Sequence, residues 1–293
     1  MNIVILSRNP ALYSTQSLVN AARKRSHYVR VFDHMHCDLV IEANQPCIYY
    51  HGQKIKNVQA VIPRIGNSAT TYGSAVIRQF ELMKTFTTLK SDPLLRARDK
   101  ISCMQILAAN GIQVPKSTIS NNIMTVSQMI DEVSPLPVVV KLVNGTHGLG
   151  VMLAEQKKMA ESIVEAFHKT KQKVFLQKFI EEAKGADVRV FIVHNEIVGV
   201  MKRQAKEGEF RSNLHRGATS EVISLTEKEK HIAIKAARVM GLKIAGVDML
   251  QTSKGPLILE VNASPGLEGI ETTTGNDIAG KIITYVEKNY NYI

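Results

Sequence analysis

The sequence is poor in cysteine and aromatic residues, and these shortages exclude several classes of protein. It contains no tryptophan, and aromatic residues make up 5% of its 293 positions, so the stacking platforms of single-stranded nucleic-acid binders are scarce. No recognised nucleic-acid-binding motif occurs, and we expect no specific nucleic-acid site. The three cysteines, Cys37, Cys47 and Cys103, form no CxxC pair. This disfavours a disulfide framework and makes a reducing cytoplasm the expected compartment.

Long apolar runs and acidic residues are also in short supply. The apolar part of the amino-terminal MNIVILSRNP is too short for a signal peptide and predicts a first strand. Nothing approaches the roughly 20 apolar residues that span a bilayer, so we expect no membrane segment. The 37 Lys and Arg residues exceed the 26 Asp and Glu residues, for a net charge of +11. That excess favours an anionic partner, although a dispersed basic surface explains it equally well.

The amino-terminal third predicts a parallel sheet. NIVIL, YVRVFD and AVIPRIG have the composition of strands, and STQSLVNAARKRSH predicts a helix opened by a Ser/Thr cap. This alternation is typical of a βαβ unit. The first turn lacks GxGxxG, so a dinucleotide-binding domain is not supported. A helix-rich stretch follows over residues 74–110.

The rest of the chain alternates less regularly and indicates α+β lobes. PLPVVVKLVNGTHGLGVMLAE predicts two strands around a glycine loop, and DVRVFIV with EIVGVMKRQ predicts a hairpin centred on His194 and Asn195. We place boundaries near residues 93–97 and 183–185. The predicted units are therefore an amino-terminal α/β domain over 1–95, a central lobe over 96–184 and a carboxy-terminal lobe over 185–293.

Polar side chains interrupt two apolar strands near the carboxyl terminus. In LILEVN, Glu260 and Asn262 lie two residues apart and therefore face the same side of the strand. Asp248 interrupts GVDML in the same way, and an antiparallel hairpin that turns near Lys254 would place Asp248 opposite Glu260. Adjacent carboxylates repel, so a cation should lie beside them. Oxygen ligands favour Mg²⁺ or Mn²⁺, and Arg or Lys is the alternative.

The glycine loop KLVNGTHGLG is a second candidate feature. Gly145, Gly148 and Gly150 lie between two predicted strands, and no GK[ST] closes the loop, so it is not a Walker A motif. Such a loop can lay backbone N–H groups over phosphates, with Lys141 supplying charge. A plain glycine turn is the alternative.

The segment DHMHCD crowds four side chains that can bind metals, His34, His36, Cys37 and Asp38. Adjacent ligands on one strand rarely reach a single ion, so a zinc or copper site is disfavoured.

Together these segments resemble an ATP-grasp carboxylate–amine ligase, and the RimK-type α-L-glutamate ligases most closely. The resemblance rests on VIPRIG, ARDK, VVVKLVNGTHGLGV, GADVRVFIV, RQAKEGEFRSNLHRGA, AGVDML and LEVNASPGLEGIE. It implies an ATP-grasp fold, in which a Rossmann-like amino-terminal α/β domain precedes two α+β lobes that clasp ATP. The implied reaction converts a carboxylate to an acyl phosphate, which an amine then attacks to form an amide.

The resemblance also implies roles for individual residues. Lys100 and Lys141 would contact phosphate. The linker over Gln177, Lys178, Phe179 and Ile180 would hold adenine, with Asp187 near the ribose. Arg211, Ser212 and Asn213 would meet phosphate or metal, and Asp248, Glu260 and Asn262 would bind two Mg²⁺ or Mn²⁺ ions. Arg203, and with it Arg211, would act in catalysis, Arg203 by steadying the oxyanion of the tetrahedral intermediate. Apart from the resemblance, Arg64 and Arg216 are candidates for binding substrate carboxylates, because guanidinium groups bind carboxylates by paired hydrogen bonds; a structural role is the alternative for each.

The resemblance implies L-glutamate as the donated amino acid and the acidic carboxy-terminal tail of a small-subunit ribosomal protein as acceptor. It also implies synthesis of oligo-α-glutamate and assembly as a homo-oligomer. One position departs from the family pattern, because Lys178 stands where we expect a glutamate. We therefore predict retained ATP use with weaker discrimination against GTP. The alternatives are an ATP-grasp ligase for another amino acid or a carrier-bound acceptor, and a basic nucleic-acid-binding protein.

Overall fold

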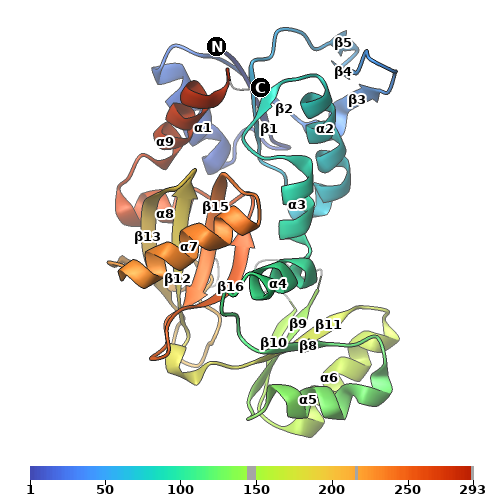
Figure 1. The fold of residues 1–293 in the computed structure, drawn as a ribbon, viewed down its shortest axis with the longest axis vertical. Helices are drawn as coiled ribbons and strands as arrows, with labels where there is room; N and C mark the ends of the chain where they lie inside the picture. Colours follow the sequence, from blue (N-terminus) through green and yellow to red (C-terminus); the bar gives the residue numbers. More distant parts are fainter. Residues whose placement is uncertain (144–149, 215–216, 292–293) are drawn as a thin grey trace.

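Four sheets make up the computed structural model, which describes residues 1–143, 150–214 and 217–291 (Figure 1). An amino-terminal part lies at the top of Figure 1, the carboxy-terminal sheet lies below it, and a central lobe forms the lower end. No helix in these described ranges is long and apolar enough to cross a bilayer.

The amino-terminal sheet is parallel, as the sequence predicts. Its strands, in spatial order, are β2 (Tyr28–Phe32), β1 (Asn2–Leu6), β6 (Ala60–Pro63) and β7 (Phe86–Thr87). Alternate residues of β1 point to opposite faces. Ile3 and Ile5 pack with the helices α1 (Tyr13–Lys24) and α9 (Ile278–Asn289), whereas Val4 and Leu6 pack towards α2 (Thr70–Leu82).

A small antiparallel sheet projects from this part of the molecule, and the sequence reasoning did not anticipate it. It consists of β3 (Cys37–Val40), β4 (Cys47–Tyr50) and β5 (Gln53–Lys54), preceded by the short helix η1 (His34–His36). On the other side of β6, the short helix η2 (Asn67–Ala69) leads into α2, and α3 (Ser91–Arg98) and α4 (Lys100–Ala109) lead down to the central lobe. Asp99 caps α4 by accepting hydrogen bonds from the backbone N–H groups of Ile101 and Ser102.

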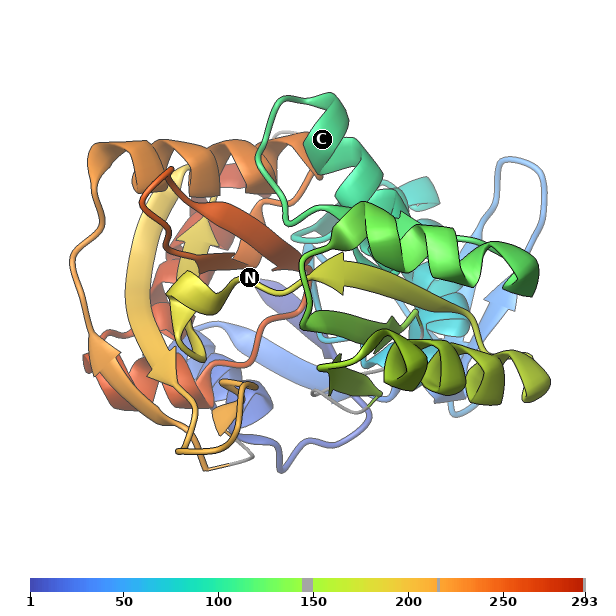
Figure 2. The same cartoon turned by 90° about the horizontal axis from the view of Figure 1, so that it is seen from below.

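The central lobe is a four-stranded antiparallel sheet with two helices on one face, α5 (Val126–Val133) and α6 (Lys157–Lys169) (Figure 2). Its strand order is β10 (Val151–Ala154), β9 (Val138–Leu142), β11 (Val174–Lys178) and β8 (Ser117–Ile119). The short helix η3 (Ile123–Thr125) precedes α5. The predicted strands on either side of the glycine loop are confirmed, and they pair with each other.

The carboxy-terminal sheet has five antiparallel strands. They are β14 (Thr219–Val222), β13 (Glu196–Gln204), β12 (Ala186–Val193), β15 (Ile244–Leu250) and β16 (Leu257–Asn262), and η4 (Glu181–Ala183) leads into β12. The predicted hairpin at His194 and Asn195 is confirmed, because Val193 pairs with Glu196. α7 (Glu227–Val239) starts with a capping box of Thr226 and Glu229 and packs on one face of the sheet, while α8 (Glu268–Thr274) packs on the other.

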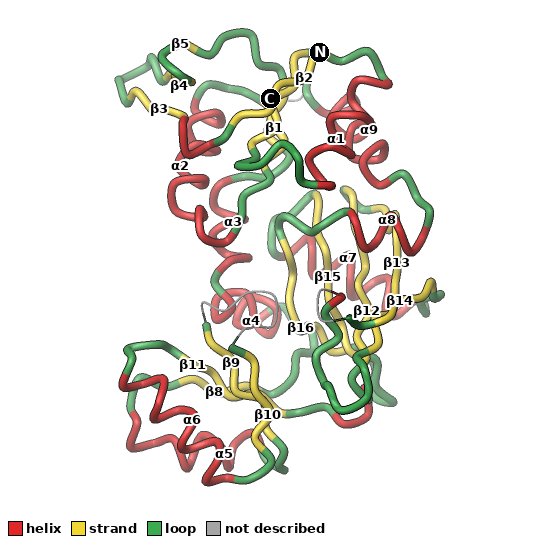
Figure 3. Tube along the Cα trace, turned by 180° about the vertical axis from the view of Figure 1, so that it is seen from behind, coloured by secondary structure: helices red, strands yellow, loops and turns green. Residues whose placement is uncertain are grey.

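The last helix returns to the amino-terminal domain. α9 lies against α1, as Figure 3 shows from behind. Glu287 of α9 accepts hydrogen bonds from Arg25 at 2.9 and 2.6 Å and pairs with His27 at 2.8 Å. Buried residues of β1, α1, β12 and α9 belong to one apolar cluster. The first and last parts of the chain therefore share a core, while the central lobe has a separate one.

Candidate active site

Asp248 and Glu260 are cross-strand neighbours, as the sequence predicts. The antiparallel pairing of β15 with β16 places Asp248 opposite Glu260 and Gly246 opposite Asn262. A bulge after Asp248 shifts the register by one residue, so that Met249 pairs with Ile258. Between the bulge and the turn, the pairing therefore differs from that of the regular hairpin that the sequence predicts. Asn262 Nδ2 donates a hydrogen bond to Glu260 Oε1 at 2.9 Å, which confirms that the two side chains share a face.

Two arginines form ion pairs with the carboxylate of Asp248. Arg189 donates from Nε to Oδ1 at 2.7 Å and from Nη2 to Oδ2 at 2.6 Å, and Arg203 Nη2 lies 3.0 Å from Oδ2. Arg203 also donates two hydrogen bonds to Asp187, which faces it across β12 and β13. Burial alone would raise the pKa of Asp248, but the two guanidinium groups hold it well below its usual range.

The donor set fits a divalent cation in part. The oxygens of Glu260 and Asn262 are suitable ligands for Mg²⁺, and the side-chain oxygen of Asn262 has no hydrogen bond within the described residues. In the described part of the chain, Asp248 Oδ1 accepts one hydrogen bond, from Arg189 Nε, so Asp248 could join them through the second lone pair of that oxygen. The described residues contain no group of three or more His, Cys, Asp and Glu side chains placed to hold a metal. Of the two alternatives left open by the sequence, an arginine partner is therefore found for Asp248, and metal binding remains a prediction.

Two lysines from different elements lie in the field of Glu260. Lys100, at the start of α4, donates to the carbonyl oxygen of Leu142 at 3.1 Å, and Lys141 on β9 donates to Gln177 Oε1 at 2.5 Å. Burial lowers the pKa of both lysines, that of Lys141 to about 8, while the charge of Glu260 opposes the shift. Paired positive charges at a buried position suit a polyanion such as a nucleotide phosphate.

Arg211 joins the carboxy-terminal lobe to the central lobe. It forms a two-pronged ion pair with Glu209 at 2.9 and 2.7 Å, and its Nη1 donates to the carbonyl oxygen of Val151 on β10 at 3.3 Å. The hydrogen bonds from Arg211 lower the pKa of Glu209 to about 2. Arg211 thus lies at the junction of the two lobes, where a ligand clasped between them would bind.

The predicted adenine linker connects the same two lobes. Gln177 and Lys178 end β11, and Gln177 Nε2 donates to Ser117 Oγ at 2.9 Å. Phe179 packs edge-to-face against Phe210, with ring centroids 6.2 Å apart. Phe179 and Ile180 are half-buried. The carboxylate of Asp187, expected near the ribose, is bound by Arg203 instead. A contact between Asp187 and the ribose therefore remains a prediction, and it would require a carboxylate oxygen of Asp187 to accept a hydrogen bond from the ribose in addition to those from Arg203.

Ser212 and Asn213 are half-buried in the segment that follows Arg211. Arg64 reaches across from the amino-terminal domain, where its Nη2 donates to the carbonyl oxygen of Pro265 at 2.7 Å. Arg216 and the glycine-loop positions Gly145 and Gly148 lie outside the described residues.

Sequence reasoning missed Arg189 and Glu209. Arg189 is two residues beyond Asp187 on β12 and shares its face, and it interrupts the apolar run VRVFIV as Asp248 interrupts its own strand. A charged residue within an apolar strand is therefore a sequence signal by which Arg189 could be identified. Glu209 lies in an irregular segment, where no periodicity relates it to Arg211.

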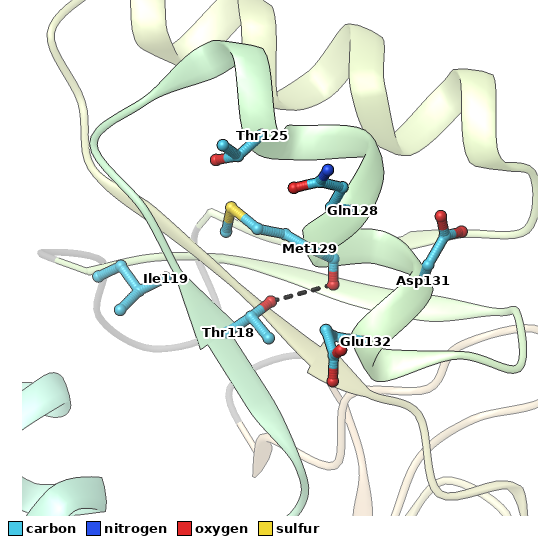
Figure 4. Close-up of a pocket in the computed structure, with 7 residues that line it drawn as sticks. All are labelled: Thr118, Ile119, Thr125, Gln128, Met129, Asp131 and Glu132. Atoms are coloured by element: carbon cyan, nitrogen blue, oxygen red, sulfur yellow. Dashed lines mark hydrogen bonds between the residues drawn. The ribbon is translucent and has the colours of Figure 1, made fainter.

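A surface hollow in the central lobe is not part of this site (Figure 4). It lies between β8 and α5, and Thr118 Oγ1 donates to the carbonyl oxygen of Met129 at 3.2 Å across it. Asp131 and Glu132 line it and pair with Lys157 and Lys116. This acidic lining does not suit a phosphate, so the hollow is a poor candidate for nucleotide binding.

The DHMHCD segment forms no metal centre in the described residues. His34 is fully buried, and neither ring nitrogen has a hydrogen-bond partner in the part of the chain that the structure describes. Burial raises the pKa of Cys37 to about 12, so its thiol is protonated and a poor ligand. The described residues of this segment therefore give no support to a zinc or copper site.

The family model described as "RimK-like ATP-grasp domain" matches residues 97–286, and the one described as "RimK PreATP-grasp domain" matches residues 1–94. A protein of Vibrio parahaemolyticus named "Probable alpha-L-glutamate ligase" is 50% identical over 289 residues, which cover 99% of this chain and 96% of the relative. One from Cellvibrio japonicus with the same name is 51% identical over the same shares of both chains.

Solved structures share the fold at lower identity. The ATP-grasp ligase PsnB complexed with a minimal precursor superposes with a TM-score of 0.76 and 23% identity, covering 98% of this chain and 99% of PsnB. D-alanine–D-alanine ligase from Bacillus anthracis complexed with ATP gives a TM-score of 0.72 at 18% identity, over 99% and 97% of the two chains. The predicted ATP-grasp fold is confirmed. With both family models matched in order along nearly the whole sequence, the chain belongs to the RimK-like ATP-grasp family.

Proposed function

We propose that this protein is an ATP-dependent ligase that adds L-glutamate to an acidic carboxyl-terminal tail. The observation that carries the proposal is the convergence of Lys100, Lys141 and Glu260 from three separate elements, α4, β9 and β16. Two phosphate-binding cations beside a hard oxygen ligand are what a nucleotide triphosphate with Mg²⁺ requires. The names of the relatives that are half identical over nearly full length support glutamate as the substrate.

The proposed reaction has two steps. An oxygen of the acceptor carboxylate attacks the γ-phosphorus of ATP, ADP leaves, and an acyl phosphate forms. The amine of glutamate then attacks the acyl carbon, phosphate leaves, and the amine loses a proton. Lys100 and Lys141 hold the phosphates and offset their charge, and bound Mg²⁺ or Mn²⁺ would add further neutralisation. Because the acyl phosphate is made by substrate atoms, no protein nucleophile is needed.

Arg203 is the donor we assign to the oxyanion of the tetrahedral intermediate. Its Nε and Nη2 are bound by Asp187 and Asp248, which fix the plane of the guanidinium group. Its Nη1 has no hydrogen bond among the described residues. The two carboxylates raise the pKa of Arg203 despite its burial, so it remains charged at every working pH. A fixed, charged donor is suited to this role.

As acceptor we propose the glutamate-ended tail of a small-subunit ribosomal protein, with repeated addition giving oligo-α-glutamate. PsnB was solved with a precursor peptide, which supports a peptide acceptor for this fold. The net charge of +11 favours encounter with an acidic tail. We therefore expect turnover of acidic tails to fall steeply with added salt. A flat salt response would remove the steering argument.

We further propose that the protein acts in the cytoplasm, where its three buried free cysteines stay reduced. We propose that it acts there as a homo-oligomer, which light scattering would test.

The test of the proposed function is ADP release with Mg²⁺, ATP and each amino acid in turn, with product masses read in parallel. We expect release that depends on glutamate, with products spaced by one glutamyl residue. The matched control is Lys141→Met, which removes a phosphate contact and should abolish release with every amino acid. Release with another amino acid would instead identify a different ATP-grasp ligase, and the glutamate assignment would be wrong.

A further inference from the structure

The amino-terminal sheet has a topological switch point that faces the candidate active site. β1 connects first to β2 on one side and the chain later returns to β6 on the other, so the strand order reverses between β1 and β6. In open parallel sheets, ligands bind outside the carboxyl ends of the strands at such a point. Here Arg8 follows the end of β1, and Arg64 follows β6 directly.

Arg64 and Arg98 lie close to each other at this edge. Arg64 Nη2 donates to the carbonyl oxygen of Pro265, at 2.7 Å, and Arg98 Nη2 donates to the carbonyl oxygen of Ile65, at 2.5 Å. Burial, together with the nearby charge of Arg98, lowers the pKa of Arg64 to about 10. Arg98 Nε is buried without a hydrogen-bond partner in the described part of the chain. Two positively charged side chains, Arg64 and Arg98, thus lie close together, and Arg98 Nε can still donate a hydrogen bond to a ligand.

Arg8 and Ser264 complete the edge. Arg8 Nη2 donates to Ser68 Oγ at 3.0 Å, and it lies so close to Gly66 that a Cβ there would come within 3.3 Å of it. Ser264, in the loop after β16, has a buried hydroxyl without a partner among the described residues. Its neighbour Pro265 accepts the hydrogen bond from Arg64. The edge is therefore built from both the amino-terminal domain and the loop next to Glu260 and Asn262.

These three arginines have no acidic partner within ion-pair distance across residues 1–143, 150–214 and 217–291. By contrast, Arg189 and Arg203 are both paired with Asp248. Arg64 and Arg98 are half-buried, whereas Arg8 is exposed. A half-buried guanidinium group without a counter-ion is unfavourable unless a ligand supplies one. Arg98 is also in the field of Glu260, so the missing anion would lie beside the proposed phosphate site.

We propose that Arg8, Arg64, Arg98 and Ser264 form a carboxylate pocket that holds the side-chain carboxylate of a glutamate. The inference rests on the proposed function. The α-carboxylate of the acceptor's last residue has to meet the γ-phosphate near Lys141 and Glu260, and free glutamate reacts through its amine. In either substrate the side-chain carboxylate is therefore left for the arginines on the amino-terminal side. Planar guanidinium groups bind carboxylates by paired hydrogen bonds, which lets the pocket select glutamate over glutamine. The carboxylate belongs either to free glutamate or to the last residue of the acceptor.

Calorimetric titration of the protein loaded with ADP and Mg²⁺ tests the pocket without turnover. The probes are L-glutamate against L-glutamine, and a peptide ending in glutamate against one ending in glutamine. The variants are Arg98→Gln and the exposed Arg8→Gln, and the matched control is Arg96→Gln, an exposed arginine two residues from Arg98 on α3. Unchanged ADP affinity and an unchanged melting temperature show that each variant is folded.

We expect both variants to bind one of the two glutamate probes about 10- to 100-fold more weakly, because each variant loses one charge-assisted hydrogen bond. Binding of the glutamine probes should not change. The probe that weakens identifies the source of the carboxylate. The pocket is refuted if the variants keep the affinity of the wild type, if glutamate and glutamine weaken alike, or if the wild type binds neither glutamate probe. The proposed function fails separately if the wild type binds glutamate at this pocket but releases no ADP with it.

Discussion

Replacement of Arg189 by methionine tests whether the buried arginine–carboxylate network stabilises the fold. Arg189 makes two hydrogen bonds to Asp248, and the two side chains are 17% and 5% exposed. Removing one partner of a buried ion pair costs about 3–5 kcal/mol because the other charge is left without compensation. Arg203 remains 3.0 Å from Asp248 Oδ2, so the loss should fall at the lower end, about 3 kcal/mol.

The assay is urea unfolding of wild type and Arg189→Met at pH 7 without divalent ions. The matched control is Arg78→Met, because Arg78 pairs with Asp92 at a similar distance, 2.7 Å, but with side chains that are 51% and 67% exposed. An exposed pair contributes about 1 kcal/mol or less. If Arg189→Met lost no more stability than Arg78→Met, the network would not be a stabilising element and our assignment of its strength would be wrong.

The same pair predicts how stability depends on pH. Burial raises the pKa of Asp248, but Arg189 and Arg203 outweigh it and lower the pKa from 3.8 to about 2. A carboxyl group with a depressed pKa stabilises the folded state above its unfolded value, and this stabilisation is lost as the pH falls through the folded value. The free energy of unfolding should therefore fall between about pH 4 and pH 2. The fall should be smaller in Arg189→Met, and equal slopes would contradict the assignment.

Three further predictions concern single positions. Because burial lowers the pKa of Lys141 to about 8, the affinity for ATP should weaken as the pH rises above that value. Binding of ATP above pH 8 should take up a proton, which calorimetry in buffers of different ionisation enthalpy would detect. An ATP affinity that stays the same from pH 7 to 9.5 would contradict this prediction. Lys178→Glu should raise the preference for ATP over GTP in ADP- and GDP-release assays, and a preference equal to that of the wild type would show that position 178 does not read the base. His34 is fully buried and its pKa is lowered by burial and by the charge of Arg8, against the opposing charge of Asp33. The folded state should therefore lose stability as the pH falls below about 6.5, where the unfolded chain gains a proton. His34→Leu should remove this dependence. By deleting two ring nitrogens that have no partner among the described residues, it should also raise the free energy of unfolding at pH 7.5 by about 1 kcal/mol; an unchanged pH dependence in urea unfolding would refute this.

Local pattern was sufficient for much of the fold. The period-two alternation of the apolar strands and the short turn between β15 and β16 predicted that Asp248 would face Glu260, and the structure confirms this pairing. The bulge after Asp248 was not predicted, because a single extra residue leaves no trace in the alternation of so short a strand. The small sheet of β3, β4 and β5 was missed for a related reason, since strands of two to four residues carry almost no periodicity.

The sequence by itself determined the order of the longer elements, the family to which the chain belongs and the side of β15 and β16 on which the polar residues lie. Only the tertiary structure decided their partners. Arg189 and Asp248 are 59 residues apart and meet because β12 lies beside β15. Arg64 and Pro265 are 201 residues apart and meet because the carboxy-terminal sheet shares a core with the first domain. Side-chain direction depends on local backbone geometry, whereas ion pairing depends on which distant strands share a sheet, and no local period encodes that choice.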